Sequence, residues 1–141
     1  MRQWVLLHYR APPNPSARRV YVWRKLKKLG ALLLHDSLWV LPDTAWTHEQ
    51  FQWLAAEIAE LDGDVMLWQA RLTLPSQEQG LVNRFIAACE HEYQPLWEAL
   101  QRDAPDRSAL ARQFQEIRRR DFFGCPLGQR VYAALSSEQE E

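Results

Sequence analysis

Short apolar runs and amphipathic segments alternate along the first 75 residues, and prolines and glycines separate one from the next. Residues 4–9 and 65–74 have the length and the aromatic and β-branched side chains that are typical of strands. Residues 31–34 and 38–41 are two further apolar runs. Because residues 35–37 between them have the composition of a tight turn, we expect a hairpin there.

Two predicted helices separate these strands. Residues 17–29 have a helical period and are followed by Gly30, which commonly ends a helix. The second helix is predicted to begin at Thr47, with Gln50 completing a capping box. The order strand, helix, strand, strand, helix, strand (βαββαβ) predicts a ferredoxin-like fold, in which two helices cover one face of a four-stranded antiparallel sheet.

The first strand is apolar on both of its faces, because Trp4 and Leu6 alternate with Val5 and Leu7. A strand with this pattern is usually buried on both sides. We therefore expect the helix-free face of the sheet to be covered by the C-terminal segment, by a second copy of the chain, or by some of each.

Beyond Pro75 the apolar side chains recur at helical spacing. We predict an α+β fold, α/β in the broad sense: a ferredoxin-like core at residues 1–75 and an appended C-terminal helical region at 76–135. The helical region is expected to pack on the core, and residues 136–141 are expected to form an acidic tail. A chain of 141 residues has the length of one compact domain.

Charge is distributed very unevenly along the chain. The net charge is −1, yet the first thirty residues hold eight of the 17 Lys and Arg and none of the 18 Asp and Glu. Such segregation produces a local positive field that the net charge conceals. The segment therefore favours an anionic ligand or partner.

The helix predicted at 17–29 divides into two arcs at 100° per residue. Its apolar arc contains Val20, Val22, Trp23, Leu26 and Leu29. The opposite arc contains Arg18, Tyr21, Arg24, Lys25 and Lys28. Arg19 lies near the middle of the apolar arc, where a charge must reach solvent, pair or meet a ligand. The candidate anion-binding residues are Arg10, Arg18, Arg19, Arg24, Lys25 and Lys28.

Two interpretations of this cationic stripe remain open. It fits a solvated helix face, which is what most such stripes are. It also fits a binding surface, because its cations have no acidic residue three or four positions away with which to pair.

The cysteines and histidines give little indication of catalysis. Cys89 and Cys125 are too few for a disulfide framework or a four-ligand zinc site. Cys89 falls on an apolar stripe and is expected to be buried, whereas Cys125 follows a glycine and could be exposed to a redox reaction with an oxidant. The four histidines form no local catalytic motif, so we expect no enzyme activity, no metal and no cofactor. The tryptophans are expected in the core, with Trp46 as the exception.

No apolar run is long enough to span a membrane. The chain begins Met1-Arg2-Gln3 and continues directly into the first strand, without the pattern of a secretory signal. We therefore expect a cytoplasmic protein that does not associate with membranes.

Three segments carry a family resemblance. Residues 15–31 read PSARRVYVWRKLKKLGA, residues 37–43 read SLWVLPD and are followed by FQWL at 51–54, and residues 120–124 read RDFFG. In order and spacing they resemble the N-terminal domain of ChrB, the chromate-resistance regulator. The resemblance implies a Cas2-like ferredoxin fold, DNA binding and chromate-responsive control of an efflux operon. It places the family's basic contact residues on Arg19 and Arg24.

The same fold raises the possibility of a nuclease, because Cas2-like proteins can carry a metal-binding Asp at the end of the first strand. Here that place is occupied by Leu7-His8-Tyr9-Arg10, and the first acidic residue of the chain is Asp36. Without a carboxylate to hold Mg²⁺, metal-dependent cleavage is not expected.

The leading hypothesis is a DNA-binding, transcription-regulatory module of chromate resistance that acts as a homodimer. One alternative is a module that binds chromate or sulfate near Arg10, Arg18 and Arg19, at the start of the first helix. A second alternative is a protein-interaction module whose basic helix meets an acidic partner, such as a separate sensor domain.

Overall fold

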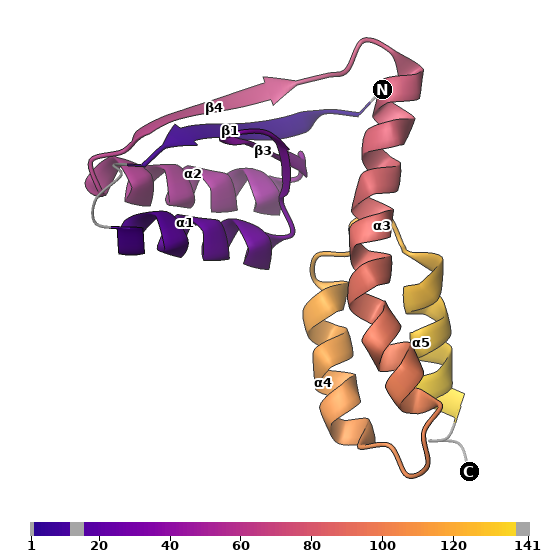
Figure 1. Ribbon diagram of the computed structural model, residues 1–141. Coiled ribbons are helices and arrows are strands. Elements are labelled where there is room, and N and C mark those ends of the chain that lie inside the picture. The colour runs from indigo at the N-terminus through magenta and orange to yellow at the C-terminus, as the bar shows by residue number, and fades with distance from the viewer. Residues whose placement is uncertain (1, 12–15, 138–141) are drawn as a thin grey trace. The chain divides into compact units, whose positions relative to one another are not determined.

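The computed structural model describes residues 2–11 and 16–137. Its first part contains one antiparallel sheet in the order β2-β3-β1-β4 (Figure 1). The strands are β1 (Trp4–Arg10), β2 (Leu32–His35), β3 (Leu38–Pro42) and β4 (Asp64–Ala70). With β1 in the interior and β4 beside it, this is the βαββαβ arrangement, so the predicted α+β fold is confirmed.

Helices α1 (Ser16–Leu29) and α2 (Ala45–Glu60) lie together on one face of this sheet (Figure 1). Alternate residues of β1 reach that face, where Val5 and Leu7 are fully buried. The helices contribute a narrow set of buried side chains: Val22 and Leu26 from α1, and Thr47, Phe51, Leu54 and Ile58 from α2.

The predicted turns are confirmed. Gly30 has φ 83° just after α1, a left-handed conformation that glycine adopts without strain. Asp36 connects β2 to β3 with φ 42°.

Strand β4 was predicted to continue to residue 74, but it ends at Ala70. Its neighbour β1 has no strand residue before Trp4 with which further residues of β4 could pair.

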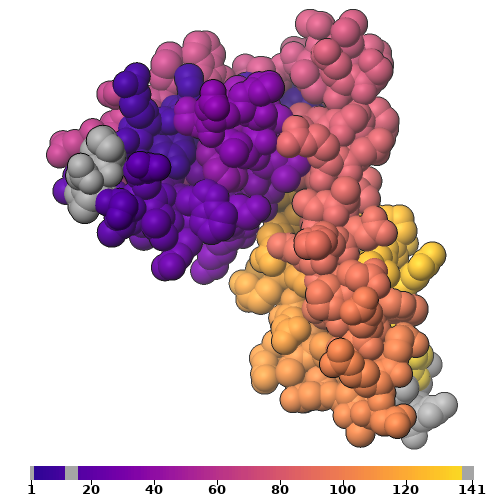
Figure 2. All heavy atoms as spheres, in the orientation of Figure 1, coloured from indigo at the N-terminus to yellow at the C-terminus, as the bar shows by residue number. Residues whose placement is uncertain are grey.

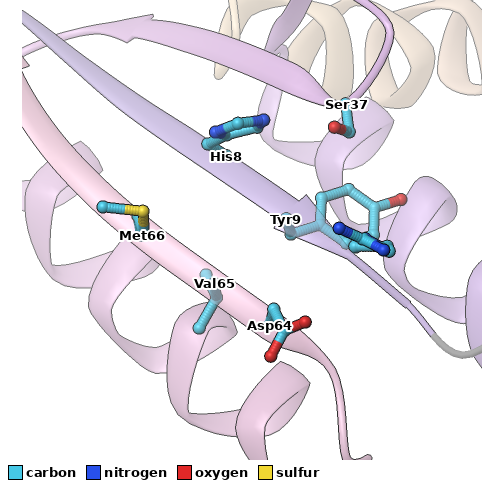
Figure 3. Close-up of a pocket in the computed structure, with 7 residues that line it drawn as sticks. His8, Tyr9, Ser37, Asp64, Val65 and Met66 are labelled. Carbon is cyan, nitrogen blue, oxygen red and sulfur yellow. The ribbon is translucent and has the colours of Figure 1, made fainter.

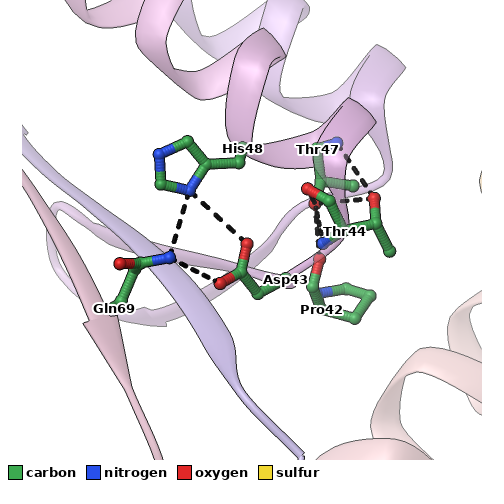
Figure 4. Close-up of polar contacts among 6 residues, drawn as sticks. All are labelled: Pro42, Asp43, Thr44, Thr47, His48 and Gln69. Atoms are coloured by element: carbon green, nitrogen blue, oxygen red, sulfur yellow. Dashed lines mark hydrogen bonds and ion pairs between the residues drawn. The ribbon is translucent and has the colours of Figure 1, made fainter.

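The predicted start of α2 is wrong by one turn. Thr44 is the N-cap, and Thr47 occupies the third helical position (Figure 4). The Thr47 amide donates to Thr44 Oγ1 at 3.1 Å, and the Thr44 amide donates to Thr47 Oγ1 at 2.8 Å. By sequence alone either threonine could be the N-cap. In the structure Thr47 is fully buried, and its hydroxyl donates to the Pro42 carbonyl at 2.6 Å. It therefore closes the capping box from inside the helix.

The second part of the chain consists of α3 (Pro75–Leu100), α4 (Arg107–Arg118) and α5 (Pro126–Ser137). By internal contacts the chain divides into two compact units, Met1–Pro75 and Ser76–Glu141. The predicted boundary at residue 75 coincides with this division, while the packing of the helical region on the core stays a prediction. Ser136 and Ser137, which were predicted to belong to an acidic tail, lie in α5, and residues 138–141 lie outside the described part.

The three helices of the second unit share an apolar core that is closed by the corner between α4 and α5. The core residues are Cys89, Tyr93, Leu96, Leu110, Phe114, Ile117, Cys125, Leu127 and Val131. At the corner, Tyr93 donates to Asp121 Oδ2 at 3.0 Å, and Asp121 Oδ1 accepts from the Cys125 amide at 3.0 Å. Cys125 is 1% exposed, so the expectation that it could be exposed is wrong. Cys89 is buried as predicted.

No helix in the described ranges is long and apolar enough to cross a membrane.

Gly128 and Gly80 provide a matched test of packing in the second unit. A Cβ at Gly128 would lie 2.5 Å from Tyr93 Cε2, whereas a Cβ at Gly80 would meet nothing within 4 Å. Gly128→Ala should lower the free energy of unfolding by about 1–3 kcal/mol through overpacking. Gly80→Ala should raise it by about 0.5–1 kcal/mol, because alanine favours the helix. Denaturant unfolding measures both changes, and equal effects would contradict this packing.

Cys89 should be almost inert towards thiol reagents. Burial, followed by the negative charges of Asp121 and Glu92, raises the pKa of Cys89 from 9.0 to about 12. At pH 8 only about one thiol in ten thousand would then be ionised, and the thiolate is the reactive form. The neutral thiol favours the folded state below pH 9, and this contribution declines as the pH rises towards 12. Rapid alkylation of Cys89 in the native protein at pH 8, read by peptide mass, would contradict this.

Candidate polyanion-binding surface

The sheet buries only a narrow stripe of α1. Val22 and Leu26, four residues apart, are the only residues of this helix that are buried among its described side chains. The predicted apolar arc was too wide: Val20 is 44% exposed and Trp23 is 51% exposed. They lie at the margins of the arc, where side chains reach solvent. Arg19, which was predicted near the middle of the arc, is also exposed.

Two cations of α1 lie over aromatic rings of the same helix. Lys25 Nζ lies 5.7 Å from the centre of the Tyr21 ring, and Lys27 Nζ lies 5.9 Å from that of Trp23. The Tyr21 hydroxyl donates to Glu57 of α2, and this hydrogen bond raises the pKa of Tyr21. The surface of α1 is therefore aromatic as well as cationic. The sequence pattern did not predict this, because Trp23 falls within its apolar arc.

Arg18 is held by the protein itself. Its Nη1 donates to the Leu61 carbonyl at 3.0 Å and lies 4.0 Å from Asp62 Oδ2. The contact joins the start of α1 to the end of α2. Arg18 was predicted to contact an anion. In the structure its guanidinium instead bonds to the end of α2.

The other predicted cations of α1 have no carboxylate partner. Among residues 2–11 and 16–137, ion pairs within 4.0 Å involve none of Arg19, Arg24, Lys25 and Lys28. All four are exposed, and α1 contains no acidic residue. Figure 2 shows the atoms of this helix on the surface, in the indigo to purple part of the colour range. These four residues are called the α1 cation surface below.

Arg10 is not part of this surface. It is the last residue of β1, opposite Asp64 of β4, and it lines a cavity with His8 and Asp64. Arg18 lines a different groove, between α1 and α2. The structure thus divides the predicted trio of Arg10, Arg18 and Arg19 between different surroundings.

Three of the six tryptophans that were predicted in the core are instead exposed, whereas Trp4 and Trp39 are buried as predicted. Trp23, Trp53 and Trp68 are each about half exposed, as is Trp46, the predicted exception. Trp53 is the most exposed, at 59%. Sequence periodicity does not separate the side of a helix that faces a sheet from its margin, because an aromatic residue can occupy either.

A polar cluster joins β3, α2 and β4. Asp43 Oδ2 accepts from Gln69 Nε2 at 2.8 Å, and Asp43 Oδ1 lies 3.5 Å from His48 Nδ1 (Figure 4). No nucleophilic side chain of the described residues bonds to His48. The described part also contains no group of three or more His, Cys, Asp and Glu that could hold a metal ion. The cluster fixes the first turn of α2 against the sheet.

Comparison with known proteins identifies the family. The model of "Protein ChrB, N-terminal" matches residues 19–102. The chain belongs to the ChrB N-terminal family. Protein ChrB of Cupriavidus metallidurans strain CH34 is 33% identical over 75 residues, which are 53% of this chain and 23% of that protein. The chain therefore aligns with about a quarter of that relative's length, and it is a distant homologue of a protein associated with chromate resistance.

The matched range covers the whole α1 cation surface and excludes Arg10 and Arg18. The likeness at residues 120–124 lies beyond the matched residues and stays a prediction. The family membership predicted from the first two segments is confirmed.

Arg18 and Arg24 should differ in their effect on stability. Arg18→Ala removes a hydrogen bond between two helices and should lower the free energy of unfolding by about 1 kcal/mol. Arg24→Ala removes an exposed side chain without a partner and should change it by less than about 0.5 kcal/mol. Thermal and urea unfolding of the two variants measure this difference. A larger loss for Arg24→Ala would mean that Arg24 has a structural contact.

Proposed function

We propose that the chain is a DNA-binding, transcription-regulatory module associated with chromate resistance, and that α1 binds the phosphate backbone. The observation that supports this most is the α1 cation surface: four exposed cations without a carboxylate partner, on a helix without an acid. The module binds and does not catalyse.

The spacing of these cations suits a row of phosphates. Arg24, Lys25 and Lys28 lie within one helical turn or little more, and Arg19 lies just over one turn before Arg24. At a rise of about 1.5 Å per residue, the surface extends over roughly 13 Å. One strand of duplex DNA carries one phosphate per about 3.4 Å of axis, so three or four phosphates of that strand lie within reach.

The neighbouring helix limits the contact to α1. Helix α2 carries Glu49, Glu57 and Glu60 and no Lys or Arg. Phosphates would be repelled from α2 and attracted to α1. DNA is therefore expected to lie along α1 and not along α2, and Trp23 supplies apolar contact area.

A homodimer would double these few contacts and is part of the proposal. Met66 and Trp68 of β4 are about half exposed and stand opposite His8 and Leu6 of β1. By strand alternation they occupy the face of the sheet without helices. Exposed apolar side chains on that face support contact with a second copy.

The salt dependence of DNA binding tests the duplex contact. Log K should fall with log salt concentration by about 0.9 per phosphate neutralised, which gives a slope of about −3 for the three or four contacts of one copy and about −6 for a homodimer. Fluorescence anisotropy with labelled DNA from upstream of the gene, with and without chromate, measures the slope. A slope near zero would refute backbone binding.

Arg19 and Arg24 are the residues to replace. Arg19→Ala with Arg24→Ala should abolish measurable binding and leave the unfolding midpoint unchanged. The matched control is Arg112→Ala, which removes an exposed cation from α4 and should leave DNA affinity unchanged. Unchanged affinity of the double variant would remove both residues from the interface.

The exposed aromatic residues favour a second candidate function, an interaction with an acidic protein. Tyr21 and Trp23 lie among the cations, and tyrosine, tryptophan and arginine are the commonest anchors of protein interfaces. Trp23→Ala distinguishes the two functions. It should strongly weaken binding of a purified acidic partner domain and reduce backbone-dominated DNA binding only slightly.

A further inference from the structure

A cavity of about 310 Å³ lies at the end of β1 (Figure 3). Three segments meet there: the end of β1, the start of β4 and the tip of the β2–β3 hairpin. The Tyr9 amide donates to the Ser37 carbonyl at 3.2 Å and so holds the hairpin tip against β1. The lining residues are His8, Tyr9, Arg10, Ser37, Asp64, Val65 and Met66.

Three of the lining side chains can donate hydrogen bonds to an anion: the Arg10 guanidinium, the His8 imidazole and the Ser37 hydroxyl. Among the described residues, none of these three side chains forms an ion pair or hydrogen bond. Arg10 and His8 are exposed and two residues apart on one strand, so their side chains project from the same face. The donors come from two segments that the Tyr9–Ser37 hydrogen bond holds together.

Asp64 adds a carboxylate to the same cavity. It is the register partner of Arg10, yet its carboxylate forms no ion pair with Arg10 within 4.0 Å. A carboxylate opposes a fully ionised anion, because two like charges in one site repel. It can accept a hydrogen bond from an anion that still carries a hydroxyl group.

We propose that this cavity binds a tetrahedral oxyanion that carries a hydroxyl hydrogen, with hydrogenphosphate as its type. Arg10, which can bind two oxygens at once, holds the anion together with His8 and Ser37. The anion's hydroxyl donates to Asp64. The site does not depend on DNA binding by α1.

Asp64 makes the cavity selective. Sulfate has the same shape as hydrogenphosphate but no hydrogen near neutral pH, so it would face the carboxylate without a hydrogen bond. A site with a polar group that only one ligand can satisfy discriminates strongly against the other. Since this cavity is open to solvent, we expect phosphate to bind about tenfold tighter than sulfate.

The volume leaves room beside a single oxyanion, since one water occupies about 30 Å³ of liquid. The anion can therefore be free, or it can be the end group of a phosphomonoester. The two sources share the chemistry of the site and differ in what fills the remaining space.

The experiment is a titration of the full chain with inorganic phosphate and, separately, with sulfate at equal ionic strength. Amide NMR shifts locate the ligand, and calorimetry gives the affinities. Phosphate should shift the amides of His8, Arg10, Ser37 and Asp64, and sulfate should bind about tenfold more weakly. Arg10→Ala should abolish both, while the control Arg112→Ala should abolish neither.

Asp64→Asn tests the selectivity itself. It removes the repelling charge, so sulfate should bind tighter and the ratio of phosphate to sulfate affinity should fall to about one. The matched control is Asp36→Asn, which removes the same charge from the hairpin tip but does not line the cavity. Its ratio should stay near that of the original protein.

Three results would overturn the proposal: shifts confined to α1, equal affinities for the two anions in the unchanged protein, or an unchanged ratio in Asp64→Asn. A nucleoside 5′-monophosphate distinguishes the sources. Tighter binding than inorganic phosphate, with added shifts around Val65 and Met66, would assign the site to a phosphomonoester. Equal or weaker binding would assign it to the free anion.

Discussion

The attachment of α1 to the sheet is the constraint on which the candidate surface depends. Only Val22 and Leu26 are buried, and Arg18 joins the start of the helix to Leu61 at the end of α2. This attachment occupies one narrow side of the helix. The rest of the circumference is available to cations and aromatic rings, and the absence of acids on α1 keeps those cations without partners. The fold therefore preserves a positive surface on a chain whose net charge is −1.

Much of the fold could be predicted because its signals are local. Gly30 and the 35–37 turn require particular backbone conformations, and the apolar periods of α1 and β1 differ clearly. The boundaries that failed depend on tertiary contacts. Thr47 is inside α2 because its hydroxyl reaches the Pro42 carbonyl, and β4 ends where β1 no longer offers a partner. Neither neighbour is visible in the local pattern.

The candidate site was predictable in composition and less so in arrangement. The sequence shows that Arg19, Arg24, Lys25 and Lys28 lack acids within helical reach, and the structure adds no carboxylate from elsewhere in the described part. It could not show that Arg18 is used by Leu61, or that Trp23 faces solvent. Both depend on where α2 lies beside α1. The position of Arg10 opposite Asp64 likewise could not be predicted. It depends on the register between β1 and β4, and these two residues are more than fifty positions apart in the chain.

Strand alternation explains why one basic segment supplies two distinct chemical environments. Tyr9 and Arg10 are adjacent, so their side chains leave β1 on opposite faces. Burial raises the pKa of Tyr9, and the charge of Arg19 acts on it in the opposite direction, which places Tyr9 on the side of α1. Arg10 instead lies on the face of the sheet without helices, where Asp64 is its register partner on β4. The cations of the α1 cation surface have no carboxylate partner among the described residues, which suits a long polyanion. A cation at the end of β1 meets a carboxylate, a hydroxyl and an imidazole, which suits a small ligand with both an acceptor and a donor.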